Sequence, residues 1–244
     1  LMYKKLIKTI FKRFGLEIKK YNPQDDFNFL VTKCLENFQI NCFWDVGANI
    51  GQTGLSIREH GYKGDIISFE PQELAHSKLI NASLADNKWK VFEKCGVGND
   101  GLKDLNISKN SVSSSFLKME KLHLDANPDS KFIKKENVKI ISLNKIFTEI
   151  NNQSDKNFLK IDAQGYEKEI LESGKNILNN FIGISCEISI HPLYEGETKL
   201  LDMFNYLNSK GYEIYSIHNS YYEIEYGQTF SIDVVFIKKM LFKN

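Results

Sequence analysis

The alternation of short apolar segments with amphipathic ones is the feature that most constrains the fold of this chain. The apolar segments, typical of buried strands, are 42–47, 65–71, 89–98, 157–162, 182–190, 212–217 and 230–239. Segments with helical spacing of apolar residues lie between most of them, at 53–60, 74–85, 167–178 and 199–207. Short strands joined by helices imply parallel pairing through right-handed crossovers. We therefore expect an α/β fold with a doubly wound, mostly parallel sheet.

The length of 244 residues fits one large α/β domain. We expect this domain to span 41–244 and to follow a helical segment at 1–40, which includes a second helix at 26–38. Residues 101–146 interrupt the alternation, because 101–120 and 138–147 look like two or three antiparallel strands rather than a crossover helix. We interpret them as a β insertion beside the ligand crevice.

The balanced charge and the cysteine spacing exclude several classes of function. With 32 Lys and Arg against 31 Asp and Glu, the net charge is +1, so nothing in the electrostatics favours a nucleic-acid partner. The four cysteines, Cys34, Cys42, Cys95 and Cys186, form no CxxC pair and have no histidine at zinc-finger spacing. We expect reduced cysteines in a cytoplasmic protein.

Residues 1–20 combine basic side chains with a helical apolar stripe. The stripe consists of Leu6, Ile7, Ile10, Phe11 and Phe14, and the opposite side carries Lys4, Lys5, Lys8, Lys12 and Arg13. Such a helix is typical of peripheral contact with an anionic membrane, here its inner face. The alternative is a helix that packs its stripe on the domain and leaves its lysines in water.

A glycine loop follows the first predicted strand and precedes a helix; its sequence is Asp45-Val46-Gly47-Ala48-Asn49-Ile50-Gly51. Its glycines let the backbone approach a ligand closely, and the N–H groups at a helix start favour negative ligand groups. A dinucleotide loop requires GxGxxG, but Asn49 stands where the second glycine is expected. Since that glycine admits a pyrophosphate, we expect a cofactor without one; a tight turn without a ligand is the alternative.

Two further positions fit an adenosine group. Glu70 ends the second predicted strand, where a carboxylate accepts hydrogen bonds from ribose hydroxyls; alone it is also typical of a solvated strand end. Around Val97, at the end of the third predicted strand, small residues leave room for an adenine ring. The segment Asn99-Asp100-Gly101 is equally typical of a plain turn.

The ordered series of motifs resembles the FkbM family of methyltransferases. The motifs are DVGANIG, FEP, GVGNDG, NSVSSS, LKIDAQGYEKEIL and EISIHPLYEG, from about Phe43 to the end of the chain. The resemblance implies the seven-stranded, Rossmann-like class I methyltransferase fold with a reversed last strand. It also implies S-adenosylmethionine as cofactor, S-adenosylhomocysteine as product, and O-methylation of a hydroxyl on a glycan, sugar or natural product.

The same resemblance implies roles for individual residues. Those expected to line the methionine half of the cofactor are Asp45, Gly47, Asn49 and Gly51. Glu70 would bind the ribose, and Asp162 would face the sulfonium from the end of the fourth strand. Amino-group methyltransferases of this fold often carry an Asn/Asp-Pro-Pro-aromatic loop there. The residues here are Asp162-Ala163-Gln164-Gly165, which favours oxygen as the methyl acceptor.

Three side chains are candidates for the base that removes the hydroxyl proton: Asp162, Glu187 and His191. Asp162 and Glu187 end neighbouring strands, so their carboxylates should face one pocket, where proximity moves their pKa values apart. His191, just past the fifth strand, belongs to the residue type that titrates nearest neutral pH. The paired acids are alternatively a Mg²⁺ site, but we prefer the base because no third oxygen ligand is apparent beside them.

Two other classes of protein are rival interpretations. An NAD-dependent sugar oxidoreductase would carry the second loop glycine, where this sequence has Asn49. It would also carry a catalytic Tyr-x-x-x-Lys pair, for which Tyr166 and Lys168 have the wrong spacing. A non-catalytic binding or scaffold protein of the same fold would have no physical reason to retain the complete set of cofactor-binding residues.

Overall fold

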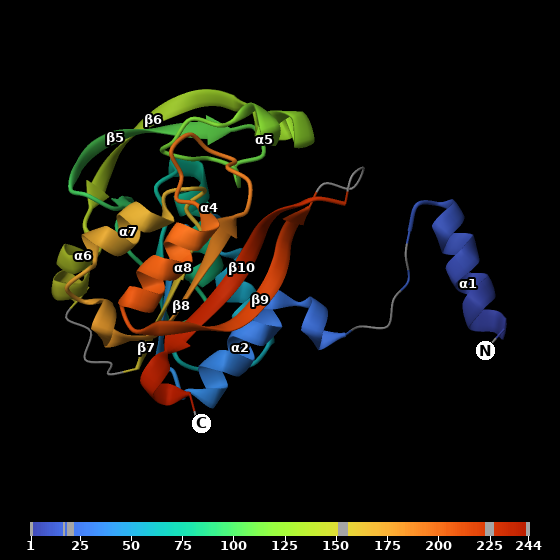
Figure 1. Cartoon of the computed structure of the whole chain (residues 1–244), viewed down its shortest axis with the longest axis horizontal. Helices are drawn as coiled ribbons and strands as arrows, with labels where there is room; N and C mark the ends of the chain where they lie inside the picture. Colours follow the sequence, from blue (N-terminus) through green and yellow to red (C-terminus); the bar gives the residue numbers. More distant parts are fainter. Residues whose placement is uncertain (1, 17, 19–21, 151–155, 223–226, 243–244) are drawn as a thin grey trace.

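The structure is a computed structural model that describes residues 2–16, 18, 22–150, 156–222 and 227–242. Within these residues the main sheet has seven strands in the order β3-β2-β1-β7-β8-β10-β9 (Figure 1). They are β1 (Cys42–Val46), β2 (Asp65–Phe69), β3 (Trp89–Val91), β7 (Asn157–Ile161), β8 (Phe181–Ser189), β9 (Tyr212–Tyr222) and β10 (Thr229–Lys238). The strands from β3 to β8 pair in parallel, and β10 is antiparallel to both β8 and β9. The predicted fold class is confirmed, including the reversed last strand.

Helices cover both faces of this sheet. One face packs on α2 (Phe27–Asn37), α3 (Gln52–Glu59) and α4 (Glu73–Ser83), and the other on α6 (Leu143–Ile150), α7 (Glu167–Ser173) and α8 (Leu200–Ser209). Successive side chains of a strand point to opposite faces of the sheet, so the core has two layers. Phe43 and Phe158 pack in the layer with α2, α3 and α4, and Trp44 and Leu159 in the layer with α6, α7 and α8. All five residues of β1 are buried, as expected for a central parallel strand.

The ends of several helices follow local rules. The Asp26 side chain caps α2 by accepting a hydrogen bond from the backbone N–H of Phe29 at 3.1 Å. Helix α7 is shorter than the predicted segment and ends at Ser173, where Gly174 packs its backbone on the Leu143 side chain. Single 3₁₀ turns are η1 (Pro23–Asp25), η2 (Pro128–Ser130), η3 (Leu178–Asn180) and η4 (Lys239–Leu241). All four cysteines are buried, and none is in a disulfide.

A three-stranded sheet stands beside the main sheet. It has the order β4-β6-β5 and consists of β4 (Gly96–Val97), β5 (Gly101–Ser108) and β6 (Phe132–Ile141), with α5 (Lys121–Ala126) between β5 and β6. The predicted third strand at 89–98 was wrong, because the main-sheet strand stops at Val91 and 96–97 pair with β6. Gly96 permits this, since a Cβ there would overlap the side chains of Ile140 and Phe116. The predicted strand at 138–147 ends at Ile141, where α6 follows.

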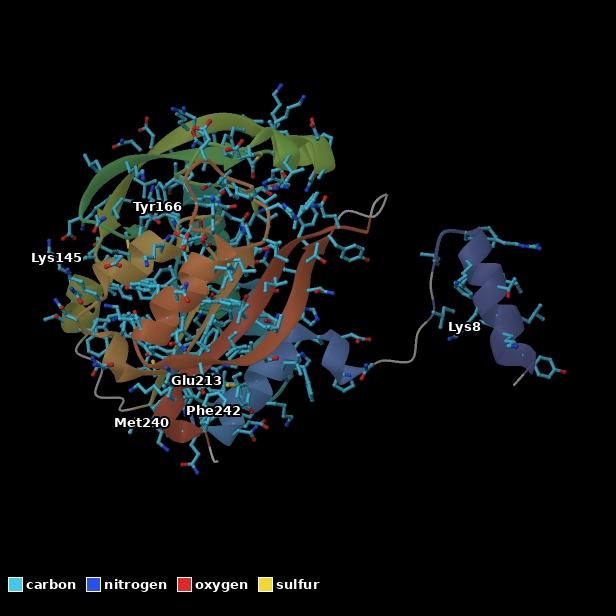
Figure 2. All side chains as sticks on the ribbon, in the orientation of Figure 1. Lys8, Lys145, Tyr166, Glu213, Met240 and Phe242 are labelled. Atoms are coloured by element: carbon cyan, nitrogen blue, oxygen red, sulfur yellow. The ribbon has the colours of Figure 1, made fainter. Side chains whose placement is uncertain are left out.

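Helix α1 (Met2–Arg13) lies apart from the rest of the molecule (Figure 1). Its apolar stripe does not pack on the domain, as Leu6 is 58% exposed and Phe14 77% exposed. Lys8 is seen on this separate helix in Figure 2. Residues 1, 17, 19 and 20 of the predicted amphipathic segment lie outside the described residues. In the part of the chain that is described, no helix combines the length and apolar character needed to cross a bilayer.

Candidate active site

The glycine loop bends sharply between β1 and α3. Gly47, Asn49 and Gly51 have φ values of +77°, +47° and +96°, in the left-handed range. A Cβ on Gly47 would overlap the backbone carbonyl of Asp162, which follows β7. Glycine at position 47 is therefore required both by its dihedral angle and by the close approach of the two strand ends.

Glu70 ties this loop to the end of β2. Its Oε2 accepts a hydrogen bond from the backbone N–H of Asn49 at 2.7 Å, and its Oε1 accepts one from that of Gln72 at 2.8 Å. The side chain is almost fully buried, and this burial raises the pKa of Glu70 to about 7. Each carboxylate oxygen retains acceptor capacity for a further donor.

A cleft lies at the carboxyl ends of β1, β2 and β7, where a doubly wound sheet binds its ligand. We call it the strand-end cleft; its free volume is about 200 Å³, and it is roofed in part by the insertion. Its lining residues are Val46, Gly47, Ala48, Asn49, Gln52, Thr53, Phe69, Glu70, Pro71, Gln72, Cys95, Gly96, Val97, Leu105, Val112, Ser114, Phe116, Lys160, Asp162, Ala163, Gln164 and Ile170. The apolar residues Val97, Leu105 and Phe116 give it one non-polar wall beside the Glu70 carboxylate.

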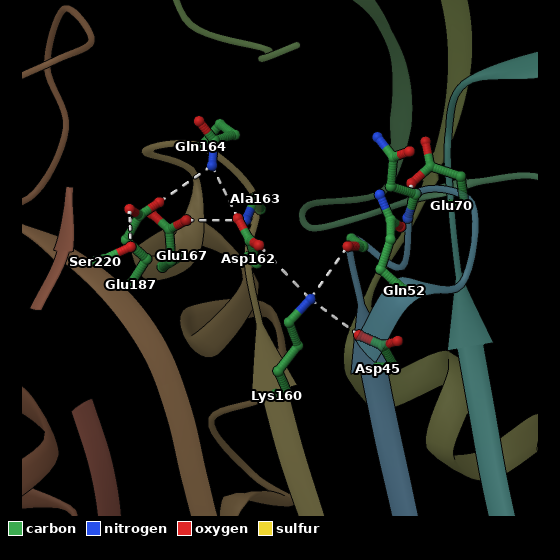
Figure 3. Close-up of polar contacts among 12 residues, drawn as sticks. Asp45, Gln52, Glu70, Lys160, Asp162, Ala163, Gln164, Glu167, Glu187 and Ser220 are labelled. Atoms are coloured by element: carbon green, nitrogen blue, oxygen red, sulfur yellow. Dashed lines mark hydrogen bonds and ion pairs between the residues drawn. The ribbon is translucent and has the colours of Figure 1, made fainter. Parts of the chain in front are cut away.

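Lys160 connects the cleft to a buried acid beneath it. Its Nζ lies 3.0 Å from Oδ1 of Asp45 and 3.7 Å from Oδ2 of Asp162, and it donates to the carbonyl oxygen of Gly47 at 3.2 Å (Figure 3). Burial alone would lower the pKa of Lys160, but Asp45 and Asp162 outweigh it and raise that pKa. The ammonium therefore stays charged and balances Asp45.

The loop after β7 holds two carboxylates together through one amide. Nε2 of Gln164 donates to Oδ1 of Asp162 at 2.8 Å and to Oε2 of Glu187 at 3.1 Å (Figure 3). Gln164 has a φ of +53°, and its Oε1 accepts a hydrogen bond from the Tyr194 hydroxyl at 2.8 Å. Burial, with the nearby charge of Asp162, raises the pKa of Glu187.

A second cavity adjoins the strand-end cleft and is lined by both Asp162 and Glu187. We call it the acidic cavity, because its walls also carry the carboxyl groups of Asp26 and Asp233. The two cavities share the residues Thr53, Lys160, Asp162 and Gln164. Asp162, which follows β7, and Glu187, which lies inside β8 rather than at its end as predicted, thus face one space next to the cleft.

The predicted site residues occupy different positions around the cleft. The strand-end cleft is lined by Gly47, Asn49, Glu70, Val97 and Asp162, whereas Asp45 lies buried beneath it. Gly51 faces away, since a Cβ there would contact Leu79 and Trp89 at 3.2 Å. His191 lines neither cavity; its Nε2 lies 2.8 Å from Nε2 of Gln228. The role of His191 as a base stays an untested prediction.

Three residues that the sequence reasoning missed shape the site. Asp233 on β10 is paired in register with Glu187 on β8. Its position as a lone acid inside the apolar strand FSIDVVFIKK could have indicated a functional residue. Glu167 accepts hydrogen bonds from the backbone N–H groups of Ala163 and Gly165 and so fixes the loop after β7. The bridging role of Gln164 had no local signal, because it depends on the distance between two strands.

The strand order with a single reversed strand, the glycine loop and the acid at the end of β2 together define a class I methyltransferase fold. A model of the FkbM methyltransferase domain matches residues 45–214. The chain therefore belongs to the FkbM family of S-adenosylmethionine-dependent methyltransferases. A search of the curated proteins found no match.

Several solved structures are similar to this chain at low identity. A putative RNA methyltransferase from Pyrococcus horikoshii has 13% identity and a TM-score of 0.48, covering 91% of this chain and 87% of its own. A putative caffeoyl-CoA O-methyltransferase from Staphylococcus aureus has 7% identity and a TM-score of 0.48, with coverages of 96% and 91%. Magnesium protoporphyrin IX methyltransferase from Synechocystis PCC 6803, with bound SAM, has 11% identity and a TM-score of 0.49, with 96% of both chains covered.

Among the described residues, no set of three or more His, Cys, Asp and Glu side chains is arranged to hold a metal ion. The close acids Asp162 and Glu187 are instead bridged by an amide donor, which is a hydrogen-bonding arrangement.

Proposed function

We propose that this methyltransferase transfers a methyl group from S-adenosylmethionine to a hydroxyl oxygen of a glycan, sugar or natural product. The observation that carries the proposal is the position of Asp162. It lines the strand-end cleft and the acidic cavity alike, and it is linked to Glu187 by the Gln164 amide. A cofactor in the first space and an acceptor in the second would meet at this carboxylate.

The residues of the strand-end cleft fit the parts of the cofactor. Glu70 offers acceptor capacity for ribose hydroxyls, and the non-polar wall containing Val97 suits an adenine ring. The left-handed backbone at Gly47 and Asn49 brings the loop close to the cleft for the methionine half. Asp162 supplies negative charge for the positively charged sulfonium.

The chemistry requires alignment and the removal of one proton. When bound, the cofactor supplies an electrophilic methyl group on a good leaving group. Holding the acceptor oxygen in line contributes up to about 7–11 kcal/mol, and a positioned base adds about 10²- to 10⁴-fold in rate. We assign the base to the pair of Asp162 and Glu187. The raised pKa of Glu187 makes its carboxylate a better proton acceptor near neutral pH.

Transfer of labelled methyl groups to hydroxylated acceptors tests this function. We expect label from S-adenosylmethionine to be recovered as a methyl ether, which is stable to mild base. Asp162→Asn and Glu187→Gln should each lower turnover by about 100-fold or more. His191→Ala should keep wild-type turnover, because His191 lies outside both cavities. Recovery of label as a base-labile ester or an N-methyl group would contradict methylation of a hydroxyl oxygen.

We also propose that the enzyme works in the cytoplasm and that α1 holds it on the inner face of an anionic membrane. Residues 2–13 carry five basic and no acidic side chains, and the stripe from Leu6 to Phe14 is exposed. The basic charge is local: residues 1–20 carry seven Lys and Arg against one Glu, or +6, whereas the whole chain is +1, which leaves −5 for 21–244. Basic residues at an anionic surface contribute about 1 kcal/mol each.

Sedimentation with vesicles tests this membrane contact. The protein should pellet with vesicles that contain anionic phospholipid and stay in solution with purely zwitterionic ones. Lys8→Glu combined with Lys12→Glu should abolish pelleting. Lys134→Glu combined with Lys145→Glu, an equal charge change on the domain, should not. Equal pelleting of both double variants, or none by the wild type, would contradict the proposal.

A further inference from the structure

The acidic cavity lies between the first turn of α2 and the strands β7, β8 and β10. Its free volume is about 370 Å³, which is within the range of small-ligand sites. Its walls are mostly polar, with Phe27 of α2 as an aromatic surface at its side. A cavity in a protein core that existed only as a packing defect would be lined by apolar groups.

The charges around this cavity are unbalanced. Among the described residues that line it, Lys160 is the only cation, and its charge is already balanced by Asp45. Asp26 is also satisfied, because it caps α2 and its Oδ2 lies 3.1 Å from Nε2 of His60. Asp162 lies 3.7 Å from the Lys160 ammonium, which it shares with Asp45, so Glu187 and Asp233 are the carboxyls of the cavity that have no ion pair among the described residues.

Neutral groups are the hydrogen-bond partners of these acids. Oε1 of Glu187 accepts from the hydroxyls of Ser220 at 2.9 Å and Ser231 at 2.6 Å, and Oε2 accepts from the Gln164 amide. Burial first, then the charges of Glu187 and Asp162, raises the pKa of Asp233 to about 8. Placing a cation here would remove the cost of holding several carboxyl groups together away from water.

Ser185 gives an independent indication that a ligand binds here. This residue lines the cavity, is only 1% exposed, and its Oγ has no hydrogen-bond partner in the structure. A buried hydroxyl without a partner costs free energy, so such groups are normally satisfied by protein, water or ligand. Ser185 occupies the same face of β8 as Glu187, two residues along the strand.

We propose that the acidic cavity binds the methyl acceptor and selects a hydroxylated molecule that carries a positively charged amine, such as an amino sugar. This inference rests on the proposed methyl transfer. The ammonium group binds beside Asp233, a second ligand hydroxyl hydrogen-bonds to Ser185, and the hydroxyl to be methylated faces the base pair of Asp162 and Glu187. An ammonium needs hydrogen-bond acceptors rather than a fixed coordination geometry, and carboxyl groups supply such acceptors. An anionic sugar is rejected by the same carboxylates.

Calorimetric titration of the full-length protein, saturated with S-adenosylhomocysteine, tests this selection with three probes: glucosamine, glucose and glucuronate. Glucosamine should bind at least about tenfold more tightly than glucose, and glucuronate should not bind measurably. Asp233→Asn should reduce the preference for glucosamine several-fold. Glu213→Gln should leave it unchanged, because Glu213 is an exposed acid on β9 outside the cavity (Figure 2). Ser185→Ala should weaken glucosamine binding without altering affinity for S-adenosylhomocysteine.

The outcomes separate this inference from the function on which it rests. Equal affinity for the three sugars, tightest binding of glucuronate, or no sugar binding by protein that binds S-adenosylhomocysteine would overturn the acceptor assignment alone. Failure to bind S-adenosylhomocysteine would overturn both. Retention of that binding by Asp233→Asn shows that the variant is folded, so a loss of preference in it supports the proposal.

Discussion

The ammonium nitrogen of Lys160 lies 3.0 Å from a carboxylate oxygen of Asp45, with the lysine side chain 12% exposed and the aspartate fully buried. Removing one member of a buried ion pair leaves the other charge without compensation, at a cost of about 3–5 kcal/mol. We expect Lys160→Met to lower the free energy of unfolding by about that amount, as measured by urea denaturation. The double variant Asp45→Asn, Lys160→Met should recover much of the loss.

Lys134→Met is the control for the Lys160 prediction. Lys134 pairs with Glu136 at 2.8 Å, but its side chain is 48% exposed, so its loss should cost only about 0–1 kcal/mol. If both variants lost the same free energy of unfolding, the buried pair of Lys160 and Asp45 would contribute no more to stability than an exposed pair.

Gly47→Ala should abolish binding of S-adenosylhomocysteine and strongly destabilise the fold. The new Cβ would overlap the Asp162 carbonyl, in addition to the strain of a positive φ. Gly61→Ala is the matched control, because Gly61 has a φ of +101° but open space around it. The free energy of unfolding of this control should fall by only roughly 1–2 kcal/mol, and its affinity for S-adenosylhomocysteine should be unchanged. Similar behaviour of the two variants in denaturation and calorimetry would contradict the close approach of the two strand ends.

Affinity for S-adenosylhomocysteine should depend on the ionisation of Glu70. Ribose hydroxyls donate to the ionised carboxylate, so binding favours its deprotonated form. Because the pKa of Glu70 is raised to about 7, affinity should fall by up to about tenfold per pH unit below that value. Above it, affinity should level off. Glu70→Gln should bind more weakly with a flat profile between about pH 6 and 8, and a wild-type profile equally flat would argue against the ribose contact.

The four cysteines should be inert towards a thiol reagent in the native protein. All are buried and none is in a disulfide. Burial raises the pKa of Cys34 and of Cys95 to about 12. Thiolate is the reactive form, so both pKa and access suppress the reaction. Four equivalents should react only after denaturation. Rapid reaction of one thiol under native conditions would place that cysteine at the surface.

The sheet could be predicted from sequence because its information is local. A buried parallel strand such as β1 is a continuous apolar run, and the helices between strands show their own periodicity. The third strand was misjudged because the apolar run continues past Val91 while the chain leaves one sheet for another. This change from the main sheet to the smaller sheet depends on the packing of Gly96 against Ile140, which is far along the sequence.

The candidate site was predictable where it follows directly from a strand end. Glu70 and Asp162 each follow a strand, so sheet topology alone brings them to one cleft. Gln164 acts through contacts across neighbouring strands, which no local pattern reveals, whereas Asp233 is recognisable as a lone acid in an apolar strand. Asp45 and Gly51 belong to the loop motif but do not line the cleft. Asp45 is buried below it, and Gly51 packs against Leu79 and Trp89.

Calorimetric titration with S-adenosylhomocysteine, with NAD as the control ligand, tests the central claim most directly. We predict micromolar binding of S-adenosylhomocysteine, its loss in Gly47→Ala and no detectable binding of NAD. Folded protein that binds NAD instead, or neither ligand, would contradict the assignment of the strand-end cleft as a methyl-donor site.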